Sequence, residues 1–222
     1  MENKELRSAG QVANEVLTAI KEPSTKGLPS STILKRFKRI AAFNTLQDPQ
    51  LEVMLEETAR FAASLNFVHQ PYWLTLSGKT GVGKTHLARA VYRQFMDQNR
   101  FEVKLDRVQN RIVGNTASYV DWRKFCDDIR SGGYSWIDDL CEEWFVILDD
   151  VGSERDPSGF IASALDRILN SRLDKWTMIT TNLSLKDVAE KIDVRVASRM
   201  LRNNGVVVEN TCVDYNLRSQ NT

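Results

Sequence analysis

Residues 78–85 combine the residue types that a phosphate-binding loop requires. They read Gly-Lys-Thr-Gly-Val-Gly-Lys-Thr, a full match to G-x-x-x-x-G-K-[ST], between an apolar segment and an amphipathic one. The glycines allow a tight turn whose amide N–H groups point toward phosphate oxygens, and the start of the following helix adds its positive end. We therefore expect Lys84 to contact the β- and γ-phosphates of ATP and the Thr85 hydroxyl to bind Mg²⁺. The alternative, a glycine-rich turn that matches by chance, does not explain why both flanking segments are of the required kind.

The predicted nucleotide-binding stretch extends one residue beyond the pattern. Within it Lys79 and Thr80 occupy variable positions and receive no individual role, and His86 is expected to pack at the start of the helix rather than to take part in catalysis. The complete stretch is Gly78, Lys79, Thr80, Gly81, Val82, Gly83, Lys84, Thr85 and His86.

A second acidic element follows an apolar run that is typical of a strand buried on both faces. This run, Phe-Val-Ile-Leu, ends in Asp149 and Asp150. We expect Asp149 to hold Mg²⁺ through water and Asp150 to position the attacking water, since a carboxylate can accept its proton. Glu154 is a second candidate for the water-positioning role. Alone this would be an ordinary strand that ends in a polar turn, but together with the phosphate loop it predicts a hydrolase of nucleoside triphosphates.

Three polar residues further along the chain are candidates for contact with the γ-phosphate. Asn182 ends the next predicted strand, and its amide can donate to the phosphate or orient water. Arg195 and Arg199 are four residues apart on a predicted helix, so both project from one face. A guanidinium suits γ-phosphate charge and could be supplied by a neighbouring subunit as an arginine finger. Alternatively, Asn182 is an ordinary residue at the end of a strand, and the two arginines form a solvated basic face in which Arg195 pairs with Asp193.

Alternating strands and helices place these residues from Tyr72 onward, the pattern of a parallel sheet with helices on its faces. Residues 107–117 lack clear periodicity and receive no assignment, and Gly132-Gly133 predicts a mobile loop in which Trp136 is exposed. The predicted strands cover residues 72–77, 118–122, 144–150, 176–182 and 205–210, and the predicted helices cover 85–96, 158–173, 186–192, 193–201 and a segment through Phe125 and Ile129.

The segment before this pattern is predicted to be helical. Apolar residues recur at helical spacing over 3–21, 32–43 and 48–66, and a Pro- and Ser-containing link separates the first two helices. We divide the chain into a partner-binding region, residues 1–45, and an ATPase domain, residues 46–222. The second helix carries a basic group, Lys35, Arg36, Lys38 and Arg39, which suits nucleic-acid phosphates and equally suits a solvated helix face.

The composition bears on nucleic-acid binding, metal and disulfide sites, and membrane association. The chain has 222 residues with 30 Lys+Arg against 29 Asp+Glu, so any nucleic-acid binding must depend on local patches. Three separate cysteines and two histidines predict neither a zinc site nor disulfides, and no segment is long and apolar enough to cross a membrane. These features predict a reduced, cytoplasmic protein.

Taken in order, four motifs resemble the DnaC/DnaI/IstB clade of AAA+ ATPases, which contains bacterial and phage helicase loaders and their transposition-helper relatives. The motifs are G-K-T-G-V-G-K-T-H-L-A, F-V-I-L-D-D-V-G-S-E, I-T-T-N-L-S and R-V-A-S-R-M. The resemblance runs from about Phe43 to the end. It implies an AAA+ core, self-association into an open ring or spiral, and Arg199 at the arginine-finger position with Arg195 as its companion. Because little chain follows Asn182, we expect no separate helical lid domain. The family's terminal Tyr-Arg pair is altered here to Tyr215-Asn-Leu-Arg218, so a nucleotide contact by Arg218 stays open.

The resemblance implies a Mg²⁺-dependent ATPase that delivers a hexameric replicative helicase onto single-stranded DNA during replication initiation. The segment 3–21 would then grip the helicase. The alternative within the clade is a transposition helper that acts on duplex DNA. A small-molecule phosphotransferase shares the phosphate loop, but Asn182 and the two arginines argue against it.

Overall fold

A computed structural model describes residues 38–45, 48–67, 71–98, 104–106, 111–113, 116–202 and 204–214. The predicted helix at 3–21, the basic residues Lys35 and Arg36, and Arg218 lie outside these ranges.

Five parallel strands form the central sheet in the order β4-β5-β6-β1-β7. The parallel sheet expected from the sequence is therefore confirmed. The strands are β1 Trp73–Gly78, β4 Ala117–Asp121, β5 Phe145–Val151, β6 Trp176–Thr181 and β7 Val206–Asn210.

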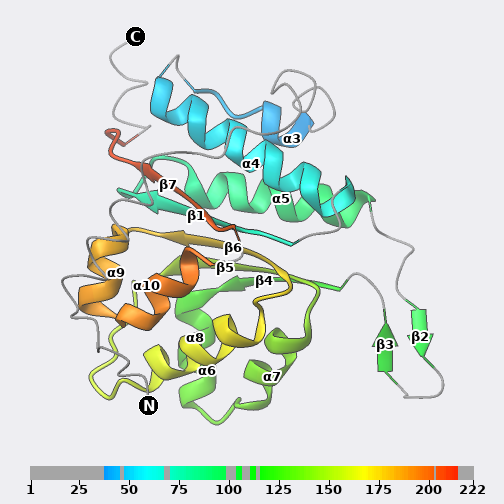
Figure 1. The fold of residues 1–222 in the computed structure, drawn as a ribbon, viewed down its shortest axis with the longest axis vertical. Coiled ribbons are helices and arrows are strands. Elements are labelled where there is room, and N and C mark those ends of the chain that lie inside the picture. The colour runs from blue at the N-terminus through cyan, green and yellow to red at the C-terminus, as the bar shows by residue number, and fades with distance from the viewer. Residues whose placement is uncertain are drawn as a thin grey trace, which may run out of the picture.

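Helices cover both faces of the sheet (Figure 1). The first three lie on one face and the remaining five on the other. In chain order they are α3 Lys38–Ala41, α4 Pro49–Phe67, α5 Lys84–Gln98, α6 Trp122–Arg130, α7 Ser135–Glu142, α8 Phe160–Ser171, α9 Leu185–Lys191 and α10 Val194–Met200.

The apolar runs in the sequence account for the central strands. All six residues of β6 and six of the seven residues of β5 are buried, because helices pack on both faces of these strands. Two hydrophobic clusters result, one between the sheet and α3–α5 and one between the sheet and α6–α10. Ile40 and Phe43 belong to the first cluster, so the described end of the region 1–45 packs on the same core as α4 and α5.

Buried Arg172 fastens the start of β6 to the layer of helices. Its side chain is 0% exposed, and its guanidinium donates to the carbonyl oxygens of Leu140, Glu143 and Trp176 and to the Thr177 hydroxyl. The cation therefore donates to several backbone carbonyl oxygens that are buried or partly buried at this point.

The structure differs from the predicted elements in three places. Residues 135–142 form helix α7, so the loop predicted around Trp136 is wrong, although Trp136 is 46% exposed as expected. The segment without an assignment, residues 107–117, contains β3 Arg111–Val113. This strand pairs with β2 Lys104–Asp106, which precedes the segment, and the two-stranded sheet stands away from the main sheet in Figure 1. Trp122 begins α6 instead of ending β4, because Asp121 caps that helix by accepting from the Lys124 N–H at 3.2 Å.

Two short helices and the edge strand β7 follow β6 in the described chain, and α10 packs on α8, α9 and β1. In these ranges no separate helical lid domain is present. None of the described helices is long and apolar enough to span a membrane.

Candidate active site

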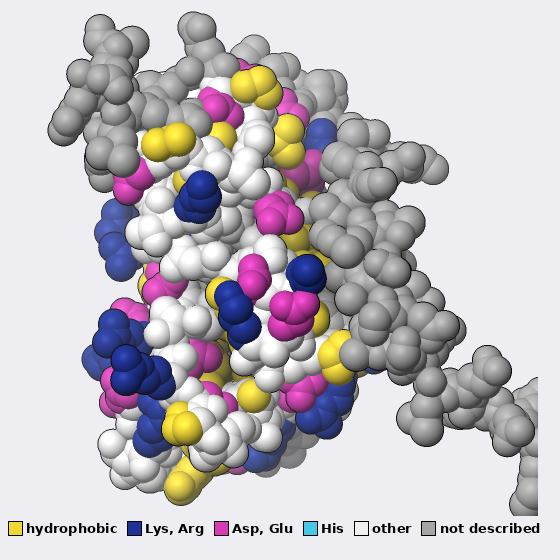
Figure 2. Space-filling model, turned by 90° about the vertical axis from the view of Figure 1, so that its left-hand side faces the viewer, with side chains coloured by type: hydrophobic (Ala, Val, Ile, Leu, Met, Phe, Trp, Pro, Cys, Tyr) yellow, Lys and Arg dark blue, Asp and Glu magenta, His cyan; other side chains and the backbone are white. Residues whose placement is uncertain are grey.

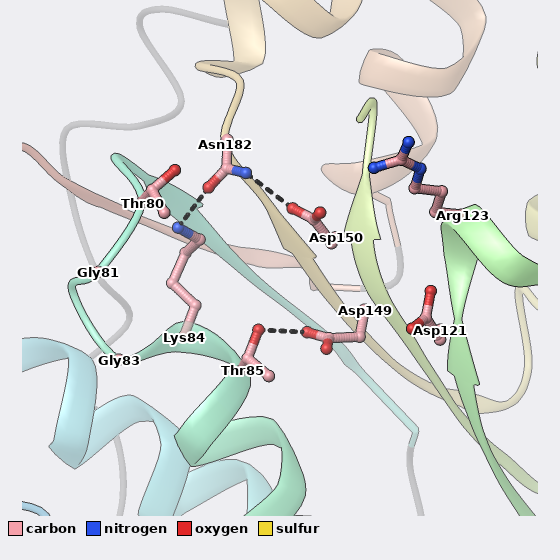
Figure 3. A pocket seen from close by; sticks show the side chains of 10 residues that line it. All are labelled: Thr80, Gly81, Gly83, Lys84, Thr85, Asp121, Arg123, Asp149, Asp150 and Asn182. Atoms are coloured by element: carbon pink, nitrogen blue, oxygen red, sulfur yellow. Dashed lines mark hydrogen bonds between the residues drawn. The ribbon is translucent and has the colours of Figure 1, made fainter. Parts of the chain in front are cut away.

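A pocket of about 430 Å³ lies at the carboxyl ends of β1, β4, β5 and β6 (Figure 3). Parallel strands direct their carboxyl ends to the same edge, which is where open α/β sheets bind ligands. The lining residues are Thr80, Gly81, Gly83, Lys84, Thr85, Asp121, Arg123, Asp149, Asp150 and Asn182.

The phosphate loop requires glycine at its tightest positions. Gly81 and Gly83 have φ angles of 83° and 94°, which disfavour side chains. A Cβ atom at Gly83 would lie 2.4 Å from the Phe43 ring, and one at Gly81 would lie 2.0 Å from a carboxylate oxygen of Asp214. The loop is thus packed closely on the chain segments on either side of it.

A row of three polar side chains crosses the pocket in the order of the strands that carry them. The Lys84 ammonium, at the start of α5 after the loop that follows β1, donates to Asn182 Oδ1 at 2.8 Å. The Asn182 amide, after β6, donates to Asp150 Oδ1 on β5 at 2.7 Å. Asn182 is therefore the link between the phosphate-loop lysine and the second acid, because β6 lies between β1 and β5.

Lys84 is held in a partly desolvated position. It is 6% exposed and also donates to the carbonyl oxygens of Gly78 and Lys79, at 2.7 and 2.8 Å. Burial lowers its pKa from 10.5 to about 8, and the charges of Asp150 and Asp149 oppose this shift. An arriving phosphate would restore the missing negative charge around the ammonium.

Asp149 is 5% exposed and accepts three hydroxyl hydrogen bonds. Thr85 and Thr180 donate to Oδ1 at 3.0 and 2.6 Å, and Tyr119 donates to Oδ2 at 2.5 Å. The hydroxyl of Thr85 and the carboxylate of Asp149 thus lie side by side at the pocket edge, and together with phosphate oxygens these oxygen atoms would suit Mg²⁺.

Asp150 has an unusual backbone for a non-glycine residue, with φ of 65°. The Thr180 hydroxyl accepts from its N–H at 2.9 Å, and β5 is irregular at this point in its pairing with β6. This conformation turns the Asp150 side chain toward Asn182. The other candidate, Glu154, accepts from the Gly152 N–H at 2.9 Å and does not line the pocket.

Sequence reasoning did not select four residues of this site. Thr180 and Tyr119 hold Asp149, while Asp121 and Arg123 line the pocket opposite the phosphate loop. Among the described residues no hydrogen bond or ion pair engages the guanidinium of Arg123. A polar residue that follows or alternates with apolar residues near the end of a strand is the signal that could have found them.

The remaining predicted site residues lie outside the pocket. Arg195 is exposed and pairs with Asp193 on its own helix terminus at 3.0 Å. Arg199 pairs with Asp166 of α8 at 2.7 Å. His86 is exposed, with its ring 5.9 Å from that of Phe43. Within one chain, neither arginine meets the phosphate loop.

Charges on the outer surface are mixed. On the face shown in Figure 2, Lys and Arg side chains alternate with Asp and Glu, and hydrophobic side chains are scattered. On α3, Arg39 is paired with Asp97 at 2.7 Å. This face therefore offers no broad field of one sign to attract a polyanion.

Comparison with known proteins identifies the fold. The model of the ATPase family associated with various cellular activities (AAA) matches residues 74–182. The structure of the DnaC helicase loader matches with a TM-score of 0.58 and 20% sequence identity, and the match covers 79% of this chain and 98% of that chain. The structure of DnaI matches with a TM-score of 0.58 and 18% sequence identity, and the match covers 84% of this chain and 93% of that chain. Domain III of the Thermotoga maritima replication initiation protein DnaA matches with a TM-score of 0.58 and 16% sequence identity, and the match covers 82% of this chain and 70% of that chain. No curated protein matches the chain by sequence.

Proposed function

We propose that this chain is an ATP-dependent helicase loader, because the AAA-family model matches residues 74–182 and the fold is like that of DnaC and DnaI. It would bind and hydrolyse ATP with Mg²⁺ to deliver a hexameric replicative helicase onto single-stranded DNA. The observation that carries the proposal is the Lys84–Asn182–Asp150 row beside the Thr85–Asp149 pair. This arrangement meets the needs of triphosphate hydrolysis, and the fold likeness supports the replication role.

The row also supplies a switch. Without phosphate, the Asn182 amide spans Lys84 and Asp150, so both charged groups are occupied. A γ-phosphate would compete for the Lys84 ammonium and for the Asn182 amide, and this would free the Asp150 carboxylate to accept a proton from water. Asn182 therefore couples phosphate arrival to activation of the base. Mg²⁺ between Thr85 and Asp149 would neutralise phosphate charge.

The nucleotide state can reach the surface through the segment that follows Asn182. Helix α9 begins three residues later, with Ser184 as its cap, and α10 follows with Arg195 and Arg199. In an assembly of several copies these two arginines would approach the pocket of a neighbour, after exchanging Asp193 and Asp166 for phosphate. Residues 1–45 would provide the grip on the helicase.

Hydrolysis and its dependence on DNA test the proposal. We expect slow hydrolysis by the protein alone, faster hydrolysis with single-stranded DNA, and loss of turnover in Lys84→Ala and Asp150→Asn. If an arginine acts between copies, mixing Arg199→Ala with Asp150→Asn should partly restore turnover, since some interfaces then have both groups. Absence of rescue at every mixing ratio would contradict the arrangement between copies.

DNA preference separates the proposal from its relative in the same clade. Stimulation by duplex DNA alone, with filaments visible in micrographs, would indicate a transposition helper instead. Phosphorylation of a nucleoside or metabolite would overturn both.

A further inference from the structure

Asp149 is oriented from both of its oxygens. Oδ1 accepts from Thr85 and Thr180, which lie on the phosphate-loop helix and on β6. Oδ2 accepts from the Tyr119 hydroxyl at 2.5 Å, across from the neighbouring strand β4. Two bonds on one oxygen allow the carboxylate to tilt, whereas a third bond on the other oxygen fixes its plane.

Tyr119 is itself held in place. Arg89, four residues after Thr85 on α5, donates from Nε to the Tyr119 oxygen at 3.3 Å, and its guanidinium carbon lies 5.8 Å from the centre of the ring. The ring packs beside that of Tyr92, with centroids 5.8 Å apart. The chain of contacts Arg89–Tyr119–Asp149 thus joins α5, β4 and β5.

The phenol can act only as a donor to Asp149. Burial, first, and the hydrogen bond to Asp149, second, raise the pKa of Tyr119 above its usual value of 10.0. The neutral phenol is therefore the donor in its hydrogen bond to Asp149. Tyr119 does not line the pocket, so it contacts Asp149 and not the space that a nucleotide would occupy.

We propose that Tyr119 is a positioning residue that orients Asp149 toward the divalent cation accompanying the nucleotide, with Arg89 holding the phenol. The inference rests on the proposed function, because it assumes that the pocket binds a metal–nucleotide complex. Groups that hydrogen-bond to a metal-binding carboxylate fix its direction, and their loss typically costs about 10–100-fold in metal affinity or activity.

The test compares Tyr119→Phe with Tyr92→Phe in the full chain. Both changes remove one phenolic oxygen from the same ring pair, but only the first removes a bond to Asp149. ADP binding is measured by calorimetry in excess EDTA and again at increasing Mg²⁺. For Tyr119→Phe we expect the affinity in EDTA to stay within about twofold of wild type, while the gain in affinity from Mg²⁺ falls about tenfold. Tyr92→Phe should keep the full gain.

Other outcomes are distinguishable. A Tyr119→Phe protein that retains the whole Mg²⁺-dependent gain would overturn the positioning role. Equal weakening with and without Mg²⁺, accompanied by a lower melting temperature, would show a purely structural role and would also overturn it. A wild-type protein that binds no ADP under either condition would overturn the proposed function itself, and with it this inference, and the wild-type titration alone reveals that case.

Discussion

Nucleotide binding should take up a proton at Lys84. Burial holds the pKa of this ammonium at about 8 in the unliganded protein. Phosphate oxygens next to it favour the charged form and return the pKa toward or above 10. At pH 8.5 the unliganded lysine is about one-quarter protonated, so binding should take up about 0.8 proton, against about 0.1 at pH 7.

The same linkage sets the pH dependence of affinity. Because only the protonated lysine binds phosphate well, the affinity for ADP should fall about tenfold between pH 7 and pH 9. The stability of the unliganded protein should change with pH in the opposite direction to its affinity for ADP. Between pH 8 and 10.5 the unfolded chain binds the proton more readily than the folded one, so the free energy of unfolding rises with pH over this window.

Calorimetry in two buffers of different ionisation enthalpy measures the proton number directly. Lys79→Met is the matched control, because it removes an exposed lysine from the same loop and should leave the uptake in place. Equal binding enthalpies in both buffers at pH 8.5 would refute the assignment of a lowered pKa to Lys84. If the proton uptake disappears in Lys79→Met, the proton is taken up by Lys79 and not by Lys84.

Three further predictions follow from the packing and the ion pairs. Gly83→Ala should abolish nucleotide binding and lower the melting temperature, because its Cβ would lie 2.4 Å from the Phe43 ring. Gly132→Ala is the control: φ is 108° and no atom lies within 4 Å of the added Cβ, so it should cost only about 1 kcal/mol of backbone strain. Thermal unfolding compares the two variants, and equal losses of stability would contradict the steric argument. Arg172→Met should lower the free energy of unfolding by at least about 3 kcal/mol in urea, since three carbonyl oxygens, two of them in buried hydrogen bonds, lose their donor. A change below about 1 kcal/mol would show that these oxygens find other donors. Arg199→Ala should keep ADP affinity but lose steady-state turnover, and full turnover would exclude it as a finger.

The parallel sheet was predictable because strands and helices alternate along the sequence and β5 contains a continuous apolar run. Six of the seven residues of β5 are buried, and such a segment leaves little choice of structure. Helix α7 was not predictable in this way, because Gly132 and Gly133 precede it and suggest a loop, while its burial comes from contact with α8. Local sequence signals could not report that distant contact.

The residues of the candidate site likewise fall into those that a local motif predicts and those that tertiary structure places there. The phosphate loop and Asp149 stand in a motif with fixed spacing, so residue order alone selects them. Tyr119 and Arg123 reach the site through the pairing of β4 with β5, and this neighbourhood is set by tertiary structure. For Asn182 the sequence suggests a γ-phosphate contact, but the bridge between Lys84 and Asp150 depends on the position of β6 between β1 and β5.

Native mass spectrometry of this protein with the replicative helicase of its host, in ATP and in ADP, tests the helicase-loader proposal most directly. We expect a defined complex whose amount or stoichiometry changes between the two nucleotides, and Lys84→Ala should remove this difference. No complex with either nucleotide, from a protein that hydrolyses ATP, would contradict the loader role while leaving the ATPase site intact.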